Sequence, residues 1–135
     1  MEVHAAGSPG YVPPEVYLSD FEATVRVSLD GLKAVDIFAF GVVVAACLSH
    51  NNPYDDLELG GMKLHKRVAE EGLRPVSKPD WPGYMISMIQ DCVRTNPTER
   101  PTFLELRERF AAVPPRGRCP ETYLPGRFLE NACKH

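Results

Sequence analysis

The chain has 135 residues, enough for one domain with a hydrophobic core but short for two. It is 44% hydrophobic and 24% charged, as is ordinary for a globular protein, and its net charge of -3 gives no reason to expect nucleic acid or an anionic membrane as partner. The amino end, MEVHAAGSPG, has neither the basic start nor the apolar run of a signal peptide. We therefore expect a soluble, cytoplasmic protein.

The first predicted element is a long apolar helix. After a Gly/Pro-rich opening and a mixed stretch to Leu32, residues 33–50 read KAVDIFAFGVVVAACLSH. This segment is apolar all round, which predicts a helix buried on every side. A membrane span is the alternative, but the apolar run is shorter than the roughly 20 residues that a bilayer requires, and it contains Asp36. We expect no membrane span.

Three shorter helices are expected after the polar loop NNPYDDLELGG, near residues 62–71, 83–93 and 102–112. The first ends at Gly72, where a C-cap glycine belongs. The last begins at Thr102, which forms a capping-box pattern with Glu105. Apolar residues recur at helical spacing in all three: Leu64, Val68, Met85, Met88, Ile89, Cys92, Phe103, Leu106 and Phe110.

Residues 114–135 have lost this periodicity, and we expect a loose tail there. The predicted fold is thus all-α, with one domain over residues 1–113. We expect the four cysteines to be reduced thiols, with Cys47 and Cys92 in the core.

The residues by themselves contain no catalytic constellation. No histidine has a partner at metal-ligand spacing, so a zinc site is not expected. The adjacent carboxylates Asp55 and Asp56 could bind a cation, but loop carboxylates of this kind are usually solvated. The sequence has no G-x-S-x-G elbow and no glycine-rich phosphate loop.

Four segments together resemble a known family. They are GSPGYVPPEV at 7–16, VDIFAFGVVV at 35–44, GLRPVSKPDWP at 72–82 and CVRTNPTERPTFLEL at 92–106. In this order they resemble the C-terminal part of a eukaryotic protein kinase domain, from its A-P-E motif to its last helix. KLHKRVAEEGLRP is especially similar to the tyrosine-kinase-like group of serine/threonine kinases. The resemblance implies the helical large lobe without the N-terminal lobe.

The resemblance assigns a partner to Arg100, which stands between the breakers Asn96-Pro97 and Pro101. In the family, this arginine pairs with the glutamate of A-P-E, here Glu15. A planar guanidinium can hold a carboxylate through two hydrogen bonds, which lysine cannot do. The alternative is that Arg100 only caps a turn in solvent.

Other residues receive roles in the same way. The resemblance implies that Ser8, Pro9, Gly10 and Tyr11 form the substrate-facing loop, with Ser8 where serine/threonine kinases carry threonine. Without the resemblance, Ser8 would simply start a turn with Pro9 and Gly10. Asp36 is implied to anchor the catalytic loop on the long helix. Phe38, Ala39 and Pro13 depart from the family pattern, and the connector from Tyr17 to Val35 is longer than usual.

The sequence contains no H-R-D or D-F-G, and phosphoryl transfer in the family also requires a glycine-rich loop and a strand lysine. All four lie before A-P-E, so we expect no catalytic residue and no ATP or Mg²⁺ site in this chain, although the intact family domain binds both. Two functions remain open: part of a serine/threonine kinase whose longer product is active, or a non-catalytic module that binds a protein substrate or a partner kinase. An unrelated helical adaptor is a third alternative.

Overall fold

The computed structural model describes residues 7–18 and 29–113, and the structure of residues 1–6, 19–28 and 114–135 is not described. The described residues form five α-helices, two short 3-10 helices and loops, with no strand among them. The helices are α1 (Pro14–Leu18), α2 (Leu29–Ser49), η1 (Asp55–Leu57), α3 (Gly61–Glu70), α4 (Gly83–Cys92), η2 (Pro97–Glu99) and α5 (Phe103–Ala111). The all-α prediction is confirmed for this part of the chain.

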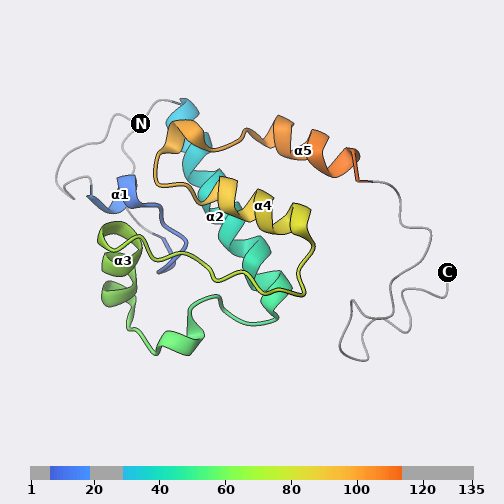
Figure 1. Cartoon of the computed structure of the whole chain (residues 1–135). Coiled ribbons are helices and arrows are strands. Elements are labelled where there is room, and N and C mark those ends of the chain that lie inside the picture. The colour runs from blue at the N-terminus through green and yellow to red at the C-terminus, as the bar shows by residue number, and fades with distance from the viewer. Residues whose placement is uncertain (1–6, 19–28, 114–135) are drawn as a thin grey trace.

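Helix α2 is the centre of the fold, with α4 packed across it and α3 beside α1 (Figure 1). Its two flanks bury different clusters. Ile37 and Ala45 pack with Trp81 and the apolar side of α4. Phe38 and Val42 pack on the other flank, with a cluster that comprises Tyr54, Leu64, Val68 and Val93.

The prediction that this helix is buried on every side is wrong. Asp36, Val43 and Cys47 are exposed, and they follow one another along one face of α2 at helical spacing. Val43 is 46% exposed. Cys47 is therefore not a core residue, whereas the prediction of a buried Cys92 is confirmed. An all-apolar pattern cannot show which face lacks a neighbour.

The length argument against a membrane span is also wrong. The helix begins one turn earlier than predicted, at Leu29, and its 21 residues make it the one described helix that is long and apolar enough to cross a membrane. Length and composition are weak evidence, because the core helix of a soluble protein passes the same test. Packing on α4 and on the α3 side is what favours a core helix here.

The predicted ends of the three shorter helices agree with the structure to within about one residue. The Thr102 hydroxyl accepts a hydrogen bond from the Glu105 amide, and the Glu105 carboxylate accepts one from the Thr102 amide, which completes the capping box. Gly72 has a φ of 69° just beyond α3, and the Leu73 amide donates to the Arg67 carbonyl. The predicted tail at 114–135, with Cys119 and Cys133, lies outside the described residues, as does most of the long connector.

Candidate functional site

Local sequence fixes the position of Arg100. Asn96 caps η2 by accepting a hydrogen bond from the Thr98 amide, and Pro97 stands at the start of this short helix. Arg100 follows as its C-cap in extended conformation, and Pro101 prevents the helix from continuing. The side chain is thereby directed away from the turn and toward α1 and α2.

Arg100 and Glu15 form a two-pronged ion pair across 85 positions of sequence. Nη1 of Arg100 lies 2.7 Å from Oε1 of Glu15, and Nη2 lies 2.8 Å from Oε2. The other bonds of the guanidinium run to the backbone carbonyls of Ala34, Arg94 and Thr95. All five of its N–H donors are therefore used. We call this pair the clamp.

The clamp joins the short helix α1 to α2 and to the η2 turn. The Arg100 side chain has no exposed surface, whereas 30% of the Glu15 side chain is exposed. The expectation that the pair is shielded from water therefore holds fully for the arginine and only partly for the glutamate. Because Arg100 is enclosed, the alternative of a turn cap in solvent is excluded.

A second guanidinium, that of Arg74, lies beside the clamp and was not found from the sequence. Arg74 donates to the backbone carbonyls of Val68, Leu73 and Val93, at the ends of α3 and α4. Its Cζ lies 5.2 Å from the centre of the Phe38 ring, and that of Arg100 lies 5.1 Å from the same ring. Burial lowers the pKa of Arg74. Phe38 thus contacts both cations, which favours an aromatic residue at this position.

Residues 8–11 form a tight turn directly before the clamp. The Tyr11 amide donates to the Ser8 carbonyl over 3.1 Å, and Gly10 has a φ of 84°. Pro followed by Gly at the centre of such a turn is typical of type II geometry. The hydrogen bond shows that Ser8 starts a turn with Pro9 and Gly10. Ser8 and Pro9 are exposed, so the Ser8 hydroxyl is also accessible, whereas Gly10 is buried.

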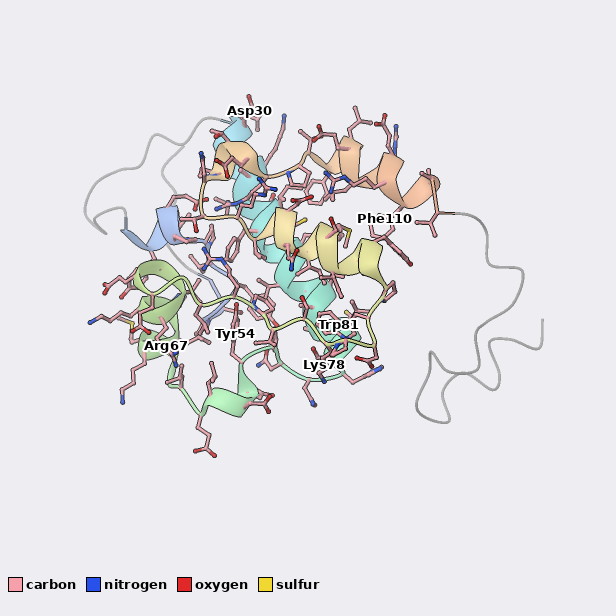
Figure 2. All side chains as sticks on the ribbon, viewed as in Figure 1. Asp30, Tyr54, Arg67, Lys78, Trp81 and Phe110 are labelled. Carbon is pink, nitrogen blue, oxygen red and sulfur yellow. The ribbon has the colours of Figure 1, made fainter. Side chains whose placement is uncertain are left out.

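Two residues of the loop after α2, Asn52 and Tyr54, contact this turn. Tyr11 donates its hydroxyl hydrogen bond to Oδ1 of Asn52 over 3.0 Å. A Cβ atom on Gly10 would lie 2.7 Å from the Tyr54 ring, so the backbone rests directly on that side chain. Tyr54 is buried, and Figure 2 shows it between α3 and α2. Neither Asn52 nor Tyr54 could be found from apolar periodicity, because both are loop residues.

Asp36 is exposed on α2, two residues after Ala34, whose carbonyl accepts a hydrogen bond from Arg100. Its implied role as an anchor of the catalytic loop stays a prediction. Among the residues that the structure describes, no group of His, Cys, Asp or Glu could hold a metal ion. Asp55 and Asp56 are both exposed.

Comparison with known proteins places this arrangement in a family. The sequence profile described as protein tyrosine and serine/threonine kinase matches residues 12–110. The chain belongs to this protein kinase family. The match runs from the residues before Glu15 to the last turn of α5, and the clamp therefore lies within the kinase domain.

Two similar proteins are probable serine/threonine-protein kinases of Dictyostelium discoideum. The chain is 27% identical over 113 residues to the probable serine/threonine-protein kinase drkA. The aligned region covers 84% of this chain and 16% of drkA. It is 26% identical over 113 residues to the probable kinase drkB, covering 84% of this chain and 15% of that protein. The chain thus spans about a sixth of the length of these relatives. It is the C-terminal, helical part of a protein kinase domain.

Proposed function

We propose that this chain supplies the helical platform and the substrate-facing turn of a serine/threonine protein kinase. The observation that carries the proposal is the clamp, which fixes the turn at Ser8–Tyr11 to the helices through Glu15. The exposed Ser8 hydroxyl would contact a protein substrate or the catalytic residues of the longer product. The similarity to drkA and drkB, whose names describe probable serine/threonine kinases, supports serine or threonine rather than tyrosine as the residue that is phosphorylated.

ATP and Mg²⁺ are required by the intact domain, but the described residues do not fit either group. They contain no carboxylate cluster for a metal, and the sequence has no D-F-G or H-R-D. No chemical step is therefore assigned to these residues, whose part is to position the substrate. Membership of the tyrosine-kinase-like group belongs to the same proposal and is supported by KLHKRVAEEGLRP. A cytoplasmic location fits the reduced state of Cys47 and Cys92.

The alternative function is a non-catalytic module that binds a kinase substrate or a partner kinase. It would use the same turn and the exposed face of α3, where Met62 is 74% exposed. The two functions differ in whether transcripts that encode this chain also encode H-R-D and D-F-G in frame before residue 1. Both motifs in one transcript support the kinase, and their absence from all transcripts supports the module.

The role of the turn is tested in that longer product. Ser8→Ala should reduce phosphorylation of a serine peptide by about 10-fold to 100-fold, since a hydrogen bond to a charged group contributes ~1.5–3 kcal/mol. Ser8→Thr retains the hydroxyl and is the matched control, with activity close to that of the wild type. If Ser8→Ala is as active as Ser8→Thr, the turn does not contribute in the proposed way.

A further inference from the structure

Ser8 combines three features of a site for covalent modification. It is the one serine or threonine in the sequence that is followed by a proline. Ser8 and Pro9 are both exposed, and the Ser8 hydroxyl makes no hydrogen bond to any residue that the structure describes. The hydroxyl oxygen is therefore accessible as a nucleophile.

Other hydroxyl groups in the described part of the chain are less available. Ser49 donates its hydroxyl hydrogen to a backbone carbonyl of α2, and Thr98 donates to Oδ1 of Asn96. Ser87 is exposed, but it lies inside α4 and no proline follows it. An enzyme that draws such a serine into its own active site has to break hydrogen bonds of the helix. Ser8 lies outside any helix and is free of this constraint.

We propose that Ser8 is phosphorylated by a proline-directed protein kinase, one that selects a serine followed by proline, and that the phosphate stops the turn from engaging a substrate. The Ser8 oxygen attacks the γ-phosphorus of ATP, and the bond from this phosphorus to the bridging oxygen breaks. ADP leaves, and the hydroxyl proton passes to the catalytic base of the modifying kinase. The ATP is bound by the modifying kinase, and this chain is its substrate. The inhibitory effect rests on the proposed function of the turn.

The backbone of the turn presents Ser8 and Pro9 to such an enzyme. Proline fixes its own φ and favours an extended conformation of the residue before it. The turn is closed by the 3.1 Å hydrogen bond from the Tyr11 amide to the Ser8 carbonyl, which leaves the Ser8 hydroxyl unengaged. The modifying kinase therefore needs to open at most one turn, and no helix, to bind the two residues.

The surroundings of the turn do not neutralise a phosphate. The turn contacts the segment between α2 and α3 at two points: Tyr11 bonds to Asn52 over 3.0 Å, and a Cβ atom on Gly61 would lie 3.0 Å from Pro9. The charged residues between these two points are all exposed carboxylates: Asp55, Asp56 and Glu58. Phosphoserine carries a charge of about −1.5 to −2 at pH 7 and is repelled by neighbouring carboxylates. We therefore expect the phosphate on Ser8 to stay in solvent, where the hydroxyl would otherwise meet a substrate.

The site is tested on the chain of 135 residues, which is incubated with a proline-directed kinase and ATP and mapped by mass spectrometry. We expect phosphate on Ser8, none on the exposed Ser87, and none in the variant Ser8→Ala. Pro9→Ala should slow the reaction at least about tenfold, since one side chain in a specificity pocket contributes roughly 10-fold to 200-fold selection. Buried Cys92 should resist alkylation throughout, which shows that the fold is intact.

A synthetic peptide of residues 7–16 shows how far the fold limits access to Ser8. Phosphorylation of Ser8 in the chain at no less than about a tenth of the rate in the peptide, while Cys92 stays protected, supports the site, because an exposed turn opens at little cost. Phosphorylation of the peptide alone, or of another serine in preference to Ser8, would overturn the proposal.

The effect of the phosphate is measured in the longer product, with a serine peptide in which no proline follows the serine, so that the modifying kinase does not phosphorylate it. Activity should fall at least about tenfold on complete phosphorylation of Ser8 and return after phosphatase treatment. Unchanged activity would overturn the inhibitory effect. This outcome is separate from the comparison of Ser8→Ala with Ser8→Thr: if Ser8→Ala is fully active but phosphorylation inhibits, the proposed role of the hydroxyl fails while the modification site stands.

Discussion

The enclosed guanidinium of Arg100 cannot change its charge and has one carboxylate partner, Glu15. Glu15→Gln should lower the free energy of unfolding by about 3 kcal/mol, at the lower end of the range for breaking a buried pair, because part of Glu15 is exposed. Urea unfolding measures the loss. The matched control is Glu71→Gln, which breaks the surface pair with Arg67 and should cost about 0–1 kcal/mol. Equal losses in the two variants would show that the clamp adds no more than a surface pair.

Asp91 provides a second test at this scale, through pH. Burial raises the pKa of its carboxyl, but hydrogen bonds from Arg109 and Arg94 outweigh this effect and lower the pKa below 3.8. A carboxyl with a lowered folded-state pKa stabilises the fold above its unfolded-state pKa and loses this contribution as the pH falls through the folded-state value. Asp91→Asn should therefore cost about 0.5–1 kcal/mol at pH 7.

The difference between Asp91→Asn and the wild type should narrow as the pH falls below about 4. Denaturant unfolding at neutral and acidic pH measures it. Asp56→Asn, on the exposed helix η1, is the control and should show no such narrowing. A constant difference at all pH values would mean that the two arginines do not act through the charge of Asp91.

At the scale of elements, the turn before α1 and the end of α3 both depend on glycine. Gly10 and Gly72 have φ values of 84° and 69°, but a Cβ on Gly10 would meet the Tyr54 ring while one on Gly72 would meet nothing within 4 Å. Gly72→Ala should therefore cost only the backbone strain of about 1–2 kcal/mol. Gly10→Ala should cost about 1–3 kcal/mol more through overpacking. Thermal or urea unfolding compares them, and equal costs would mean that the turn does not rest on Tyr54.

The elements also show where sequence reasoning succeeded. Helices with a clear cap or a C-terminal glycine, such as those at Thr102 and Gly72, were placed within a residue or two. The clamp was found because two motifs of one family named both partners. Arg74 was missed because three of its four hydrogen bonds run to backbone carbonyls, those of Val68, Leu73 and Val93, and a backbone carbonyl is present at every residue and so gives no sequence signal. The exposed position of Cys47 was missed because burial depends on which neighbours are present.

At the scale of the whole molecule, the open face of α2 limits stability. Leu29 is 69% and Val43 is 46% exposed, and each large apolar side chain left in water forgoes part of the roughly 1.5–3 kcal/mol that burial contributes. A few such losses are comparable with the ~5–15 kcal/mol net stability of a whole domain. The resemblance to an intact kinase domain implies that this face of α2 packs against the part of the domain that precedes Glu15. The chain of 135 residues should therefore unfold at low temperature and bind a hydrophobic dye.

Two serine substitutions on the same helix test this expectation. Val43→Ser removes an exposed apolar group, so dye binding should fall while stability changes by less than about 0.5 kcal/mol. Ile37→Ser places a hydroxyl where only 2% of the residue is exposed, so it should cost more than about 3 kcal/mol and increase dye binding.

Calorimetry of the same chain should detect no micromolar binding of ATP, because the sequence has no H-R-D, D-F-G or phosphate loop. A sharp thermal transition without dye binding would mean that α2 is already covered, and micromolar ATP binding would contradict the assignment of this chain to the helical platform alone.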